Sequence, residues 1–277
     1  MAKRNRYKNL GPVLISFTAI LAVIGMIFET VAILFGYDPV MRVFKLRSSV
    51  ASASVAALFI ISIAMISIAI CVGKLGKMRS KAPGNGLSDT VSTVGGFALA
   101  AFSTVLLVQT FKKWAEMEQF KLSPLDMFTV ILFAVSIPTA LYFFLGTAKG
   151  DKRTTFLAFF PPIWNAMCLV RLYFDAETAI NDPVRILLQI TLVTVMLALM
   201  YELKLRVKGT GKVMFTVTAS LSTVLACSSF MSVMLLFVIV KVGTVADMLL
   251  SVGTLFVSLY LLMRLSAYYK PIKERDK

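Results

Sequence analysis

The chain has 277 residues, 58% of them hydrophobic, and its mean hydropathy is +0.83. A soluble domain is only about 45–50% apolar, so this surplus excludes a soluble globular protein and indicates that lipid is the solvent. Lys and Arg outnumber Asp and Glu by 29 to 14. Because the basic residues lie mostly in short segments between apolar runs, they indicate membrane topology and argue against nucleic acid as a partner.

Eight apolar stretches have the length that a helix needs to cross a bilayer, about 20 residues. They are residues 11–36, 49–73, 91–111, 126–147, 155–175, 184–203, 213–240 and 245–268. The loops between them are too short for a soluble domain. The sequence therefore predicts an all-α fold, a polytopic transmembrane helical bundle of about eight spanning helices in a single integral membrane domain, residues 1–277.

The distribution of basic residues predicts the orientation of this bundle. If the N-terminus lies inside, 20 of the 29 Lys and Arg residues fall on the inner side and nine on the outer side, alternating loop by loop. This asymmetry follows the positive-inside rule and predicts that both termini are cytoplasmic, N-in and C-in. The first apolar run continues to Gly36, too long for a cleavable signal peptide, so we expect it to remain as a membrane helix.

Two ionisable residues lie within predicted membrane helices, where charge is costly and commonly functional. Glu29 lies in the first helix, about 10 Å before its end at Gly36, and Arg171 lies in the fifth, about 6 Å before Asp175. Both helices run outward, so the two side chains have similar depth. We hypothesise that Glu29 and Arg171 face each other. The alternative is that Arg171 extends to the headgroups and Glu29 is protonated or beside water.

The fifth predicted helix is the most irregular, because Pro161 and Pro162 lie inside its spanning run. Consecutive prolines remove backbone donors and kink a helix, and other groups must then bind the freed carbonyls. Asn165, one turn after Pro161, is a candidate for that role, and Trp164 lies beside it. Such a broken helix either lines a transport site or only shapes the bundle.

Polar residues in two other helices are interpreted as structural. Thr218, Ser222, Ala226 and Ser229 form one small-residue face of the seventh helix, which is typical of close helix packing in lipid. Glu202 lies at the inner end of the sixth helix and is predicted to be interfacial.

The tripeptide Asp-Pro-Val occurs twice, at 38–40 and at 182–184. This match indicates either a parallel 4+4 repeat that relates residues 1–148 to 149–277 or a chance match.

Several chemistries have no sequence support. The chain has no histidine, which excludes a His-based zinc site and a Ser-His-Asp triad. It has no ATP-binding P-loop and no HExxH or GxSxG motif. Its three cysteines lie far apart within apolar runs. We therefore expect no enzyme activity, no cofactor and no metal site.

The segment from Phe159 to Glu202 contains Phe-Pro-Pro-Ile-Trp at its start, then Arg171-Leu-Tyr-Phe, the Asn181 loop and Tyr201-Glu202. In these residues it resembles multi-spanning membrane proteins from anaerobic Gram-positive bacteria. The resemblance implies a bacterial cytoplasmic membrane and no particular activity.

The sequence supports two candidate functions. One is an accessory or regulatory membrane component that acts by helix packing with a membrane protein partner or in a homo-oligomer, favoured by the small-residue faces. The other is a small-molecule or lipid transporter with its site at the fifth helix, near Glu29 and Arg171. A cavity that reaches Pro161, Asn165 and Arg171 would favour transport.

Overall fold

The structure is a computed structural model that describes residues 10–45, 48–76, 78, 86–116, 123–145, 152–174 and 181–269, without the side chains of 152–154. Its longer elements are α2 (Leu10–Val31) with η1 (Ala32–Gly36), α3 (Ser49–Leu75), α4 (Gly86–Ala115), α5 (Pro124–Phe144), α6 (Lys152–Leu157), α7 (Phe160–Phe174), α8 (Pro183–Lys208), α9 (Lys212–Leu235) with η2 (Leu236–Val240), and α10 (Val245–Tyr269). Within the described residues, eight helical segments are long and apolar enough to cross a membrane. The predicted all-α bundle is confirmed.

The helix bounds extend past the predicted ones, most clearly in α4. The sequence predicts residues 91–111, whereas the helix begins at Gly86 and ends at Ala115. Its first turn contains Asp89 and its last turn contains Lys112 and Lys113. These charges end the apolar run, but an acid near the start and bases near the end of a helix interact favourably with the helix dipole, so the helix continues beyond the apolar run at both ends.

Helix α9 is the centre of one group of helices, since it packs against α2, α3, α8 and α10. The predicted small-residue face of α9 is buried in these contacts. Gly25 of α2 lies so close that an added Cβ atom would be 2.5 Å from Ser228 Oγ. Small residues thus pack this part of the bundle, as predicted.

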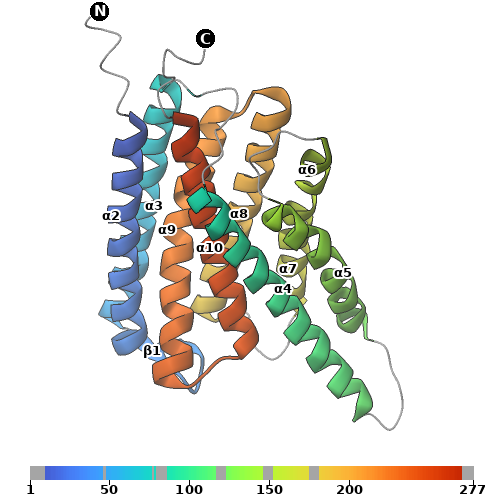
Figure 1. The fold of residues 1–277 in the computed structure, drawn as a ribbon. Coiled ribbons are helices and arrows are strands. Elements are labelled where there is room, and N and C mark those ends of the chain that lie inside the picture. Colours follow the sequence, from blue (N-terminus) through green and yellow to red (C-terminus); the bar gives the residue numbers. More distant parts are fainter. Residues whose placement is uncertain are drawn as a thin grey trace, which may run out of the picture.

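Helices α4, α5 and α7 form the other group. Helix α4 crosses α10 obliquely and also packs on α5, while α7 packs between α5 and α8 (Figure 1). The crossing is close, because a Cβ atom on Gly253 would lie 2.5 Å from Leu99 Cδ2. From this crossing the far end of α4 runs away from α9.

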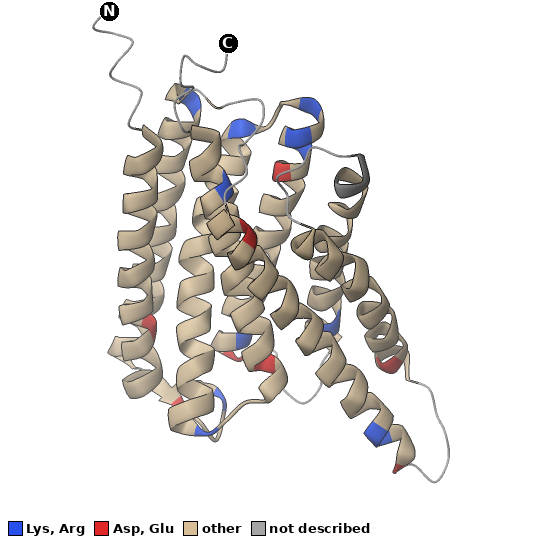
Figure 2. Cartoon of the chain, viewed as in Figure 1, with Lys and Arg blue, Asp and Glu red and all other residues tan. Residues whose placement is uncertain are grey.

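The two ends of the bundle differ in character. Leu10 and Tyr269 lie at one end, here termed the terminal end (Figure 1). The opposite or hairpin end contains the two short strands β1 (Tyr37–Asp38) and β2 (Val43–Phe44), which pair antiparallel. Basic residues lie at both ends of the bundle, whereas acidic residues lie mostly toward the hairpin end (Figure 2). The start of α2 and the end of α10 lie together on one side, with a Cβ atom on Gly11 placed 2.5 Å from Tyr269 Cβ, while the N-in orientation stays a prediction.

Candidate functional site

The fifth spanning segment is broken. Helix α6 ends at Leu157 and α7 begins at Phe160. Pro161 and Pro162 thus lie in the first turn of α7, where a missing N–H leaves no helical hydrogen bond unmade, so they start a helix and do not bend a continuous one. Asn165 Nδ2 donates to the Pro161 carbonyl over 2.8 Å, which is the contact that the sequence predicts for Asn165.

Trp164 connects α7 to α4. Its side chain is fully buried, and Nε1 donates to Ser103 Oγ over 3.2 Å. The ring also packs edge-on against Phe102, with 5.9 Å between ring centroids. Trp164 and Phe102 therefore form a rigid aromatic layer between α4 and α7.

A cavity of about 510 Å³ lies on the hairpin side of this aromatic layer, and we term it the vestibule. It is lined by Arg42 near the hairpin, by Phe102, Leu106, Gln109, Thr110 and Lys113 of α4, by Leu125, Asp126 and Thr129 of α5, by Cys168, Arg171 and Leu172 of α7, and by Gly243, Thr244, Ala246 and Asp247 at the start of α10. Phe102 belongs to both the vestibule and the aromatic layer, so this layer borders the vestibule.

The candidate residues of the fifth segment lie in two places, some in the vestibule and some outside its lining. Arg171 lines the vestibule, one turn beyond Cys168, whereas the buried prolines, Trp164 and Asn165 do not line it. The break in the helix is therefore not part of the cavity wall, and the cavity expected for transport, which would reach Pro161, Asn165 and Arg171, is found only at Arg171. It sets the position of α7, and the C-terminal half of α7 supplies the cavity-lining residues.

The vestibule contains guanidinium groups without a carboxylate partner. Arg171 Nε donates to Thr129 Oγ1 over 3.3 Å, and neither Arg171 nor Arg42 forms an ion pair with any described residue. Arg42 occupies the tight turn between the strands with a φ of 52°. Two permanent positive charges thus face one polar cavity.

The carboxylates of the vestibule, in contrast, are already bound. Asp126 lies 3.5 Å from Lys113 Nζ and accepts a hydrogen bond from Trp114 Nε1 over 3.2 Å. Asp247 accepts from the N–H and the hydroxyl of Thr244, over 3.0 and 2.8 Å, at the start of α10. These local contacts occupy both acids, so the cationic side chains of the lining that form no ion pair with a described residue are Arg42 and Arg171.

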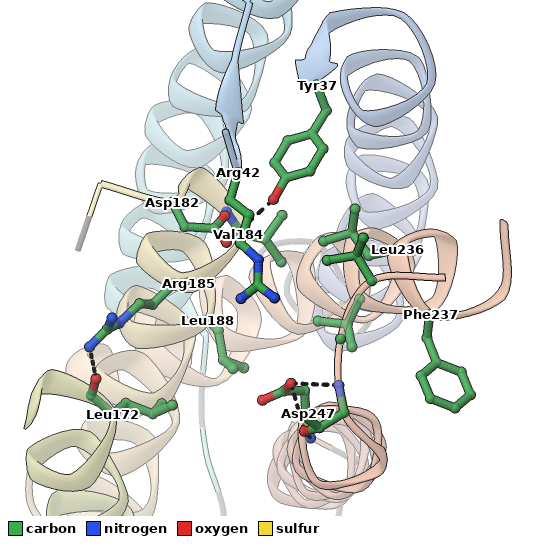
Figure 3. A pocket seen from close by; sticks show the side chains of 14 residues that line it. Tyr37, Arg42, Leu172, Asp182, Val184, Arg185, Leu188, Leu236, Phe237 and Asp247 are labelled. Atoms are coloured by element: carbon green, nitrogen blue, oxygen red, sulfur yellow. Dashed lines mark hydrogen bonds between the residues drawn. The ribbon is translucent and has the colours of Figure 1, made fainter. Parts of the chain in front are cut away.

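A smaller cavity of about 70 Å³ adjoins the vestibule and shares Arg42, Leu172 and Asp247 with it (Figure 3). Arg42 extends into it from the hairpin. Tyr37 donates its hydroxyl to Asp182 Oδ2 over 3.4 Å. Burial raises the pKa of the Asp182 carboxyl, and burial together with that carboxyl raises the pKa of the Tyr37 phenol.

Asp182 and Arg185 fix the helix ends around this smaller cavity. Asp182 accepts from the Val184 N–H over 2.9 Å and so caps the start of α8. Arg185 donates to the Leu172 carbonyl and, over 3.2 Å, to the Tyr173 carbonyl at the end of α7. Asp182 thus binds an N–H group left free at the start of α8, and Arg185 binds carbonyls left free at the end of α7, which joins the two helix ends.

The predicted pair of Glu29 and Arg171 is not formed. Glu29 is buried and accepts a hydrogen bond from Ser232 Oγ over 2.8 Å. It borders a separate apolar groove of about 450 Å³ between α3 and α8, far from the vestibule lining. The prediction fails because equal depth in the membrane does not make two helices neighbours, and α2 packs on α9 and α3 while α7 packs on α5 and α8.

A buried charge cluster near the terminal end was missed by the sequence analysis. Glu202, predicted to be interfacial, is 1% exposed. Its Oε1 accepts from Arg206 Nη2 over 2.6 Å, from Arg264 Nε over 3.1 Å and from the Tyr260 hydroxyl over 3.3 Å. The i,i+4 spacing of Glu202 and Arg206 was a usable signal, whereas nothing in the sequence indicates that α10 brings Arg264 to them.

Among the described residues, no group of His, Cys, Asp and Glu could hold a metal ion. No protein-family model, no curated protein and no solved structure matches the chain. The resemblance of residues 159–202 to Gram-positive membrane proteins and the 4+4 repeat stay predictions.

Proposed function

We propose that this polytopic membrane protein transports a small anionic solute, which binds first in the vestibule. The observation that carries the proposal is the pair of guanidinium groups of Arg42 and Arg171, which line one polar cavity without an ion-pair partner among the described residues. Guanidinium groups bind carboxylates and phosphates through paired, charge-assisted hydrogen bonds.

The dimensions of the vestibule support this proposal. Its volume of about 510 Å³ falls within the range of about 300–1,000 Å³ for small-molecule sites in proteins. A cleft lined by an excess of one charge also raises the local concentration of the opposite ion. The solute class is therefore a small carboxylate or phosphate ester.

The aromatic layer beside the vestibule supports an alternating-access mechanism. We infer that the layer of Phe102 and Trp164, which borders the vestibule, separates it from the terminal end, and the Glu202 cluster joins α8 to α10 beyond it. A solute bound beside Arg171 thus has no open route to the terminal end, and transport requires the α4–α5–α7 group to move against the rest of the bundle.

We place the protein in a bacterial cytoplasmic membrane with the terminal end inside and the hairpin end outside. The excess of basic residues in the predicted inner segments supports this orientation. The vestibule then receives its solute from outside the cell.

The accessory role retains one supporting observation. The small-residue face of α9 is buried inside the chain, so it does not supply a surface for a partner. On α3, however, Ser52, Ala53 and Ala56 are exposed and allow close approach of another helix. A partner or a second copy that packs on α3 is compatible with transport through the vestibule.

A cysteine-reactivity experiment tests the proposed charge of the vestibule. In a variant with Cys71, Cys168 and Cys227 replaced by Ala, Gln109→Cys would report from the vestibule and Val40→Cys from the exposed hairpin. We expect an anionic methanethiosulfonate to react faster than a cationic one at position 109, with a rate ratio about tenfold above that at position 40. Arg171→Gln should reduce this ratio. Equal ratios at the two positions would contradict an anion-attracting vestibule.

Transport itself is measured with proteoliposomes and radiolabelled acetate, succinate and inorganic phosphate. We expect uptake of at least one of these anions by the wild-type protein and its loss in the double variant Arg42→Gln, Arg171→Gln. If the wild-type protein takes up none of the three, or if the double variant retains full uptake, the proposed transport of small anions is wrong.

A further inference from the structure

A second groove lies at the terminal end, on the lipid-facing side between α7 and α8. It has a volume of about 470 Å³. One wall is formed by Phe159, Pro162 and Ile163 around the helix break, and the other by Met196 and Met200 of α8. Phe159, Ile163 and Met200 are exposed on the surface of the described chain. In a membrane, lipid would cover these side chains. The groove is thus a preformed apolar channel open to the acyl-chain region.

The length of the groove matches one leaflet. Along α8 its lining runs from Met196 to Lys208, which is about 18 Å at the rise of an α-helix. Half of a bilayer hydrocarbon core is about 15 Å. An acyl chain that lies along α8 would therefore extend from the headgroup level to the middle of the membrane within this groove.

Two basic side chains mark the headgroup end. Lys204 and Lys208 both line the groove, one helical turn apart in the last part of α8. Neither forms an ion pair with any described residue. Two ammonium groups at the interface, at the end of an apolar channel, are complementary to a phosphate attached to an acyl chain.

We propose that this groove binds an anionic phospholipid, with the headgroup phosphate between Lys204 and Lys208 and one acyl chain between Pro162 and Met200. Because α7 also supplies Cys168 and Arg171 to the vestibule, the lipid would stabilise the helix that forms one wall of the vestibule. The proposal rests on the groove alone and does not require that the vestibule transport an anion.

The binding test uses native mass spectrometry of the full chain with dioleoyl-phosphatidylglycerol and dioleoyl-phosphatidylcholine. We expect the wild-type protein to prefer phosphatidylglycerol, and Lys204→Gln, Lys208→Gln to weaken its binding about twentyfold. The matched control is Lys74→Gln, Lys212→Gln, which removes two exposed lysines at the terminal end outside the groove. Equal binding of the two lipids, or an equal loss in the control, would overturn the proposal.

Two further measurements separate the acyl chain from the headgroup. Met200→Trp fills the groove and should weaken phosphatidylglycerol binding while leaving both lysines in place. Glycerol 3-phosphate, which has the headgroup charge without an acyl chain, should not displace the lipid. If Met200→Trp binds as the wild type does, or if glycerol 3-phosphate competes, the site is a phosphate site and not a lipid groove. The thermal unfolding midpoint of each variant shows whether the bundle is intact.

Discussion

Arginine side chains are treated in opposite ways at the two ends of this bundle. Near the terminal end, Arg206 and Arg264 both contact the carboxylate of Glu202, with Arg264 buried and Arg206 mostly buried. At the hairpin end, Arg42 and Arg171 line a cavity and form no ion pair with a described residue, although Arg42 lies near enough to Asp182 to lower the pKa of that carboxyl. The same residue type therefore forms a structural cluster in one place and an available binding group in the other.

This difference separates ionisable residues that stabilise the fold from those that are available to bind a ligand. The partners of the Glu202 cluster come from α8 and α10, and the single carboxylate is shared by both guanidinium groups inside the protein. Breaking such a buried group of charges leaves an uncompensated ion. A charge that borders a cavity, in contrast, has a solvated or ligand-bound alternative, and its loss has little effect on folding.

The largest expected effect is that of Glu202→Gln. The change keeps the shape of the side chain but leaves Arg206 and Arg264 buried without a negative partner, which costs about 3–5 kcal/mol in comparable buried clusters. We expect a large fall in the thermal unfolding midpoint in detergent. The control is Asp38→Asn, a hairpin residue without an ion pair among the described residues. If both variants unfold at the same temperature, the Glu202 cluster does not stabilise the folded bundle.

The sequence predicts this contrast only in part. Hydropathy identifies the eight spans, because the length and apolarity of each helix are local properties, and the two prolines predict the break before α7. Neighbour relations between helices are not local. For that reason Glu29 was expected beside Arg171 although it contacts Ser232, and the contribution of Arg42 from the hairpin to the vestibule was not foreseen.

A smaller effect is expected for Trp164→Phe in the layer between the two ends. The change removes the hydrogen bond from Nε1 to Ser103 Oγ and leaves some space in a fully buried site. Together these changes should cost about 1–2 kcal/mol, seen as a lower unfolding midpoint. Ser103→Ala removes the same bond from the other side, so the two changes combined should cost less than their sum. Full additivity would show that this bond does not couple α7 to α4.

The pH dependence of the hairpin end should be weaker still and centred on Asp182. Burial raises the pKa of this carboxyl, while the neighbouring N–H groups, Tyr37 and Arg42 oppose the shift. A raised folded-state pKa favours the protonated form in the folded protein. Its stabilising contribution is then complete below the usual Asp pKa of about 3.9 and is lost as the pH rises through the raised value.

Asp182→Asn tests this dependence, since Asn also caps a helix but does not titrate. We expect the unfolding midpoint of the wild type, relative to this variant, to decline as the pH rises from about 4 to about 7. Because the shift is partly offset, the decline should be smaller than the effect of Trp164→Phe. A relative midpoint that rises over this interval would mean that the Asp182 carboxyl is stabilised in its charged form.

The smallest effect on stability should be that of Arg171→Gln. Its side chain gives up one hydrogen bond to Thr129 over 3.3 Å and no ion pair with a described residue, so the unfolding midpoint should change by less than the equivalent of about 0.5 kcal/mol. The same variant should still lower the anion preference of a thiol at position 109. A loss of stability comparable to that of Glu202→Gln would place Arg171 in a structural cluster and remove the distinction between the two ends on which the vestibule proposal depends.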